Sequence, residues 1–310
     1  MTGIKFPFKN VSAYRLIPEF TANASAESLR TALQTQAYHE GENGPESENP
    51  GWATVRDGDL VYSMQRQHLL KYKVAKRVLP GGVVKDAVAR RAKQIEEKQG
   101  YKPGRKQMKE IKELVTAELL PKAFLQTRET LVWLDLEDGW LFIDAASDSR
   151  RDDILGLLSK TFTPFPVVPL HVAQSPAGSM TAWLNDGEAP GGFTIDQEVE
   201  LVSTGESAAS VRYLRETPEQ EEVLRQVGAG KQCVKLALTW NDRISFVLTA
   251  DLTIKRLAPL DVMRESYDES GDGAANADDM YQSMFVLFTG EVRKMMADVV
   301  LSLGGEAEGE

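Results

Sequence analysis

Residues 68–121 read HLLKYKVAKRVLPGGVVKDAVARRAKQIEEKQGYKPGRKQMKEIKELVTAELLP. This stretch contains the clearest signals of secondary structure in the chain. Lysines alternate with apolar residues over His68 to Val78, which is typical of a strand and would place Lys71 and Lys73, with Lys76, on one face. Pro80-Gly81-Gly82 ends that strand. Apolar residues then recur at helical spacing on both sides of Lys102-Pro103-Gly104, as far as Pro121. The stretch therefore predicts a basic strand followed by a helical hairpin.

Positive charge is concentrated in the same region. From Arg66 to Lys112 there are fifteen basic and four acidic residues, a net charge of +11, whereas the rest of the chain has 21 basic and 42 acidic residues. The whole chain carries −10. This asymmetry indicates a local field for a polyanion on a body that otherwise repels one. Lysines and arginines that only solvate long helices would give a similar local count, so both interpretations stay open.

Elements on either side of this stretch complete a first α+β unit. The N-terminal side predicts a strand over Lys9–Ile17, a helix over Ser25–Gln36, a loop over His39–Asn49, and strands over Gly51–Val55 and Asp59–Gln65 joined by an Asp57-Gly58 turn. The C-terminal side predicts a β-hairpin of Thr130–Leu136 with Trp140–Ala145, then a helix over Asp152–Thr161. The Pro-rich run Pro164–Pro169 cannot be helical and is expected to cross between domains.

The second half of the chain repeats the order of three strands, helix and hairpin. It predicts strands at 192–195, 198–203 and 210–215, a helix from a Thr217 cap to Gly228, a hairpin of 235–239 with 243–248, a strand at 252–257, an acidic mobile segment at 261–279 and a closing helix at 280–303. We therefore expect an α+β fold of two related units with antiparallel sheets. The first unit would span residues 1–92 and 123–165, the inserted helical hairpin 93–122, and the second unit 166–310.

Composition excludes several classes of protein. Hydrophobic residues make up 42% of the 310 residues and charged residues 26%, as in ordinary globular proteins. No apolar run approaches the roughly 18 residues of a membrane helix, and the N-terminus lacks the apolar block of a signal peptide. The single cysteine, Cys233, and three scattered histidines exclude a disulfide framework and a cysteine-based zinc site. A cytoplasmic protein is expected.

Candidate catalytic motifs fail on spacing or context. Gly230-Lys231 lacks the first glycine and the hydroxyl residue of a phosphate loop. Glu110-Ile111-Lys112 has the E-x-K spacing of a metal-dependent nuclease but falls in the middle of a predicted helix. The acidic segment at 261–279 lacks the register of a calcium loop, and Cys233 is expected to be a buried core thiol. We therefore expect no enzyme activity, no cofactor and no metal.

The composition of the basic region indicates what it could bind. Tyr72 and Tyr101 are its only aromatic residues, too few for a platform that stacks single-stranded bases. No zinc finger, basic zipper or RNA-binding sheet motif is present. These features favour contact with the phosphates of duplex DNA without sequence readout. The alternative is a protein-interaction module whose basic helical hairpin docks an acidic partner.

Short motifs in a fixed order over about 300 residues resemble the RdgC family of bacterial recombination-associated proteins. The motifs are Phe8-Lys9-Asn10, Tyr14-Arg15-Leu16, Leu79-Pro80, Val83-Val84-Lys85, Leu119-Leu120-Pro121-Lys122-Ala123-Phe124, Leu131-Val132-Trp133-Leu134-Asp135, Pro166-Val167-Val168-Pro169-Leu170, Ala229-Gly230-Lys231, Lys235-Leu236-Ala237-Leu238-Thr239-Trp240, Thr289-Gly290-Glu291 and Leu303-Gly304-Gly305-Glu306.

The resemblance implies a non-enzymatic, sequence-independent binder of double-stranded DNA in the nucleoid. It implies a homodimer that forms a ring around DNA, head to head and tail to tail, through a basic central hole. It also implies opposition to the recombinase RecA and a link to replication-fork repair. The inserted helices would then be the tip that closes one side of the ring, and the second unit would be the base that makes the other contact.

The resemblance also assigns roles to individual residues. Phe124 is expected to anchor one dimer contact, although as a residue at a helix end it could equally be a core aromatic. Arg215 is the candidate at the second dimer interface, where the alternative is a solvated strand end. The expected phosphate contacts are Lys71, Lys73, Lys76, Arg77, Lys85, Arg90, Arg91 and Lys93.

Overall fold

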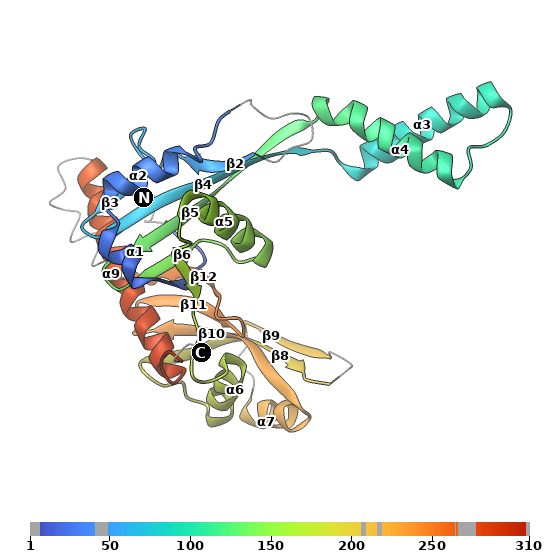
Figure 1. Cartoon of the computed structure of the whole chain (residues 1–310). Coiled ribbons are helices and arrows are strands. Elements are labelled where there is room, and N and C mark those ends of the chain that lie inside the picture. Colours follow the sequence, from blue (N-terminus) through green and yellow to red (C-terminus); the bar gives the residue numbers. More distant parts are fainter. Residues whose placement is uncertain are drawn as a thin grey trace.

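A computed structural model describes residues 7–40, 49–205, 209–215, 219–263, 265 and 277–307. The chain has the expected α+β fold with antiparallel sheets. Two sheets and their helices form a crescent, and a long helical hairpin projects from one end of it (Figure 1). The predicted loop at 39–49 and the acidic segment at 261–279 lie largely outside the described residues.

The first sheet has the strand order β2-β4-β5-β6-β1-β7, with β3 also paired to β4. Its strands are β1 (Ser12–Leu16), β2 (Asn49–Ala53), β3 (Val61–Met64), β4 (Gln67–Val78), β5 (Phe124–Asp135), β6 (Trp140–Ile143) and β7 (Val167–Pro169). β2 and β3 do not pair with each other, because both lie along the same edge of β4. The Asp57-Gly58 turn therefore interrupts one sheet edge. The Pro-rich run contributes β7, which pairs with β1, so its residues belong to this sheet and not only to a crossing.

Three helices accompany this sheet: α1 (Pro18–Asn23), α2 (Ala26–Gln34) and α5 (Asp148–Thr161). α2 begins at a capping box formed by Ser25 and Ser28, and it buries Leu29 and Leu33 four residues apart. α2 and α5 share one hydrophobic core with Leu70 and Tyr72 of β4. α1 was not predicted, because its six residues are too few to show a helical period.

The projecting arm consists of α3 (Gly81–Gln99), α4 (Arg105–Leu119) and the short 3-10 turn η1 (Leu120–Lys122). The predicted helical hairpin is thus confirmed, and the arm has a small core of its own, formed by Val84, Val88, Ile111 and Val115. α3 continues without a break through the domain limit expected at residue 93. β5 begins at Phe124, six residues before the expected start, and pairs with β4 as far as the base of the arm.

The second sheet has the order β12-β11-β10-β8-β9. Its elements are β8 (Phe193–Ser203), β9 (Ser210–Leu214), β10 (Lys231–Trp240), β11 (Ile244–Thr249), β12 (Ile254–Pro259), α6 (Pro176–Asp186) and α7 (Gln220–Gly228). α6 was not predicted, although Ser175 and Pro176 form a typical helix start. The expected Thr217 cap lies outside the described residues.

The predicted relation between the two units is wrong. In the first sheet the strand before the helical insertion, β4, pairs with the strand after it, β5. In the second sheet the strand before α7, β9, is an edge strand that pairs only with β8. Also, the strands expected at 192–195 and 198–203 are one strand, β8. A similar order of elements along the chain thus forms two different topologies, because hydrophobic pattern does not specify strand neighbours.

The C-terminal helix α9 (Ala277–Ser302) joins the two halves. Its Phe288 lies 5.5 Å from Phe8 and 5.7 Å from Trp133 of the first sheet, measured between ring centroids. Met295 and Val299 belong to the same hydrophobic cluster, which extends into the second sheet. The two sheets therefore share one core and are not independent units.

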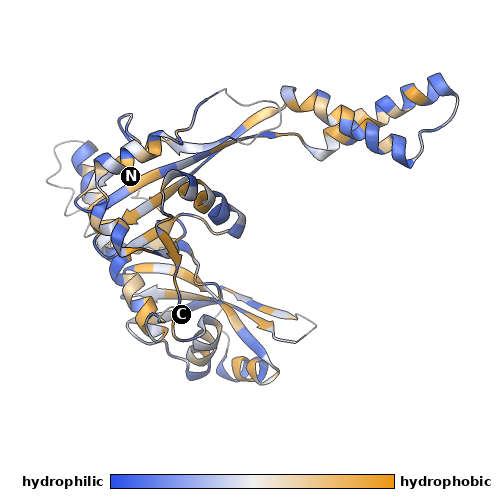
Figure 2. Cartoon of the chain, viewed as in Figure 1, coloured by the Kyte–Doolittle hydropathy of each residue, from blue (hydrophilic) through white to orange (hydrophobic). Residues whose placement is uncertain are grey.

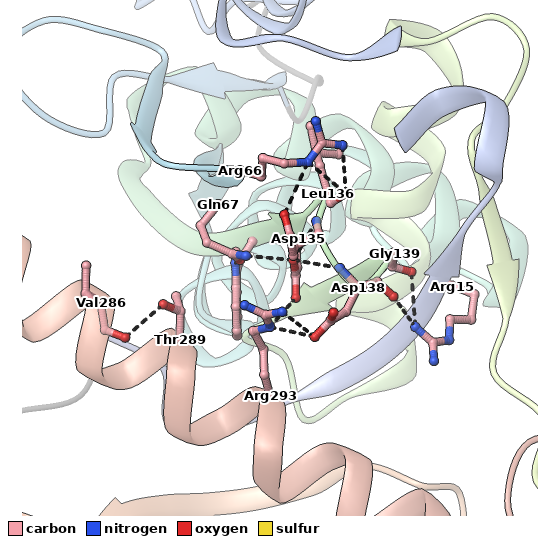
Figure 3. A network of polar contacts seen from close by, with 12 residues as sticks. Arg15, Arg66, Gln67, Asp135, Leu136, Asp138, Gly139, Val286, Thr289 and Arg293 are labelled. Atoms are coloured by element: carbon pink, nitrogen blue, oxygen red, sulfur yellow. Dashed lines mark hydrogen bonds and ion pairs between the residues drawn. The ribbon is translucent and has the colours of Figure 1, made fainter. Parts of the chain in front are cut away.

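A polar network attaches α9 to the inner end of β5 (Figure 3). Asp135 is fully buried, and its Oδ2 lies 3.0 Å from Arg293 Nε. Gln67 Nε2 donates to Asp135 Oδ1 at 2.7 Å, and Trp133 Nε1 donates to Gln67 Oε1 at 2.7 Å. Burial raises the pKa of Asp135, although the hydrogen bond from Gln67 and the positive charge of Arg293 act to lower it. Arg293 supplies the compensating positive charge for a carboxylate that water does not reach.

Replacing Arg293 should destabilise the fold. Arg293→Met leaves the Asp135 carboxylate buried without its counter-charge, so we expect the free energy of unfolding to fall by about 3 kcal/mol. Urea denaturation at neutral pH measures the change. Lys294→Met, on the exposed neighbouring position, should change it by less than about 0.5 kcal/mol. Equal effects of the two variants would contradict the assigned role.

Candidate nucleic-acid interface

The lysines of β4 lie on two faces of the strand. The register between β4 and β5 is unbroken, so residues alternate strictly from Gln67 to Val78. Lys71 and Lys73 share one face, and Lys76 lies on the other. The expectation that all three share a face is therefore wrong, because it required a bulge that the strand does not contain.

Lys71 and Lys73 flank an acidic residue of β5. Their Nζ atoms lie 3.5 Å and 4.0 Å from the carboxylate of Glu129. Lys73 Nζ also lies 4.6 Å from the ring centroid of Tyr38. Glu129 thus offsets part of the positive charge that this pair of lysines offers to a phosphate.

Arg77 has a structural role at the base of the arm. Its Nη1 donates to the carbonyl oxygens of Pro121 at 3.0 Å and Ala123 at 3.1 Å. These bonds join the strand that enters the arm to the segment that leaves it. The guanidinium is therefore held by two backbone acceptors at the base of the arm.

The cations of the arm helices are mostly exposed. Lys85, Arg90 and Lys93 of α3 extend into solvent, whereas Arg91 Nη2 lies 2.6 Å from Glu118 and links α3 to α4. Hydrophilic and hydrophobic residues alternate along both helices (Figure 2). Further exposed cations, beyond the predicted set, cover the distal half of the arm: Lys98, Lys102, Arg105, Lys106, Lys109 and Lys112.

Two arginines near Lys76 were not among the site residues predicted from the sequence. Arg128 is paired with Val74 in the β4–β5 ladder, so it shares a face with Lys76. Arg150, in the first turn of α5, stacks over Tyr72 with 5.7 Å between its Cζ and the ring centroid. Alternation along β5 would have revealed Arg128 if the strand had been recognised as beginning at Phe124.

The two residues expected at dimer contacts lie in separate halves of the crescent. Phe124 is the first residue of β5 at the base of the arm, and its 90% exposure excludes a role as a core aromatic. Arg215 follows the edge strand β9 with a φ of 58°. The arm and the β8–β9 hairpin form the two limbs of the crescent (Figure 1).

The residues weighed as catalytic candidates in the sequence lie in ordinary helix and core positions. Glu110-Ile111-Lys112 is in the middle of α4, where Ile111 is buried in the core of the arm. Cys233 is buried in β10, and burial raises the pKa of its thiol to about 12, as expected of a core thiol. Within the described ranges, no group of three or more His, Cys, Asp or Glu residues could hold a metal ion. No helix in that part of the chain is long and apolar enough to cross a membrane.

Comparison with known proteins gives matches over nearly the whole chain. Residues 6–306 match the family model described as "Putative exonuclease, RdgC". A protein from Burkholderia orbicola named "Recombination-associated protein RdgC" is 47% identical over 302 residues, which cover 97% of this chain and 96% of the relative. A protein of the same name from Bordetella parapertussis is 48% identical over 300 residues, covering 96% and 98% of the two chains. The chain therefore belongs to the RdgC family of recombination-associated proteins.

Proposed function

We propose that this protein binds double-stranded DNA through its phosphates, without reading the sequence, and thereby modulates recombination. The observation that carries the proposal is the set of exposed cations on a projecting arm, in a chain whose net charge is −10. Phosphate contacts of this kind gain affinity mainly by releasing counterions and do not depend on base identity. The relatives' name, which refers to recombination, supports DNA as the polyanion.

We propose binding without strand cleavage, although the family description mentions an exonuclease. Metal-dependent nucleases hold their ions with several clustered carboxylates. The nuclease-like triplet on α4 instead places Glu110 in solvent beside a buried Ile111. Incubation with duplex DNA and Mg²⁺ should leave the DNA intact.

Two copies of the crescent would enclose DNA as a homodimeric ring. The exposed Phe124 would make the contact at one end and Arg215 the contact at the other. Acidic residues dominate the chain outside the basic region, so the body would repel DNA while the enclosed surface attracts it. In the cytoplasm such a ring would act in the nucleoid and at replication forks, where it would oppose RecA.

Charge reversal on the arm tests phosphate binding. Lys85→Glu combined with Lys93→Glu should weaken binding to unrelated duplexes to the same extent, because every sequence presents the same backbone. Losing two phosphate contacts should reduce the slope of log affinity against log salt by about 2. Fluorescence anisotropy with two duplexes of unrelated sequence, over a salt series, measures both quantities.

A matched double variant away from the arm controls for total charge. Lys9→Glu with Lys255→Glu changes the net charge equally and should leave the slope unchanged. An arm variant that binds DNA as tightly as the control, but no longer binds an acidic protein, would favour the alternative function of docking an acidic partner.

Removing the Phe124 ring tests the dimer contact. Phe124→Ala should weaken dimerisation because a large apolar ring that is solvated in the monomer would lose its partner surface. Sedimentation equilibrium gives the dimerisation constant. Phe165→Ala, at an exposed aromatic residue of the body away from the arm, is the control. An unchanged constant for Phe124→Ala would remove this residue from the interface.

A further inference from the structure

A cavity of about 600 Å³ lies where the arm leaves the body, on the face of the sheet covered by α5. β4 contributes Lys76 and Arg77 to its lining, β5 contributes Arg128, and the first two turns of α5 contribute Ser149, Arg150 and Asp153. Asp153 is the one carboxylate among the described lining residues, against the cations Lys76, Arg128 and Arg150; the side chain of Arg77, which alternation places on the other face of β4, is not counted. The cavity therefore carries a local excess of positive charge.

The arrangement follows from the ladder between β4 and β5. Lys76 is paired with Gln126 and Val74 with Arg128, so alternation places Lys76 and Arg128 on the face that α5 covers. α5 begins at Asp148 after Ser147, whose side chain makes no capping bond. The positive end of the helix thus lies beside the cations, and the carboxylate of Asp148 in the same turn offsets part of its charge.

One arginine of the cavity has a donor without an acceptor. Arg150 Nη1 is buried and has no hydrogen-bond partner among the described residues. Stacking on Tyr72 fixes the Arg150 guanidinium. A buried donor without a partner is costly, so this group is held ready for an acceptor that the described part of the chain does not provide.

We propose that this cavity is a phosphate-binding pocket that takes one phosphate group of the DNA backbone. The inference rests on the proposed function, since DNA supplies the phosphate. Planar guanidinium forks match the oxygens of a phosphate, and a cation on a flexible stem such as Lys76 can close over it. The pocket would fix the position of one phosphate at the base of the arm, in addition to the phosphate contacts made by the exposed cations of α3 and α4.

The test compares inorganic phosphate with DNA as ligands of the full-length chain. The pocket variants are Arg128→Gln, whose side chain is exposed and leaves the core untouched, and Arg150→Gln. The matched variant is Lys85→Gln, which removes the same charge from the arm. Phosphate binding is followed by line broadening of its ³¹P resonance, and DNA binding by anisotropy with a duplex lacking terminal phosphates. Thermal denaturation checks that each variant folds.

We expect both pocket variants to lose phosphate broadening and to bind DNA about tenfold more weakly, as for a lost charge-assisted hydrogen bond. Lys85→Gln should keep the phosphate signal. Unchanged broadening in Arg128→Gln and Arg150→Gln would overturn the pocket. Lost broadening with unchanged DNA affinity would overturn DNA as the source of the phosphate. A wild-type chain that binds phosphate in the pocket but does not bind DNA would overturn the proposed function and leave a site for a free phosphate compound.

Discussion

The antiparallel ladder between β4 and β5 is the constraint on which the rest of the structure depends. It runs without a bulge from Gln67 opposite Asp135 to Val78 opposite Phe124. The inner half of the ladder, which includes Thr130 to Asp135, is buried between α5 on one face and α9 on the other. The outer half, which includes Phe124 to Glu129, connects the arm to the body. A two-stranded ribbon is marginally stable alone, so the strand register in the exposed outer half depends on the packing of the buried inner half.

The register between β4 and β5 determines on which face of the ribbon the charged residues lie. The Asp135–Arg293 contact fixes the inner end of β5 to α9, and from there alternation decides which face each outer residue occupies. Lys71 and Lys73 lie on one face beside Glu129, whereas Lys76 and Arg128 lie on the other beside Arg150. A shift by one residue would exchange the two faces and disperse the cations. The core therefore specifies which face of the ribbon each of these cations occupies.

The elements that could be predicted from the sequence are those with a clear local period or a strong terminator. The basic strand, the helical hairpin and the β-hairpin that turns between Leu136 and Trp140 are of this kind. The first half of β5 could not be predicted, because Phe124 to Glu129 has no buried face and its partner lies across the whole helical insertion. For the same reason the shared face of Lys76, Arg128 and Arg150 was missed. These three residues come from separate segments, and only the long-range pairing brings them together.

The most direct test of phosphate binding by an encircling dimer is the affinity of the wild-type chain for a closed circular duplex and for its linear form. It is measured over a salt series, with the mass of the oligomer recorded in parallel. We expect a dimer whose log affinity falls steeply and linearly with log salt on both forms, with retention on circles and loss from free ends. The absence of binding at low salt would contradict the proposed function, and equal retention on circles and linear DNA would contradict encirclement.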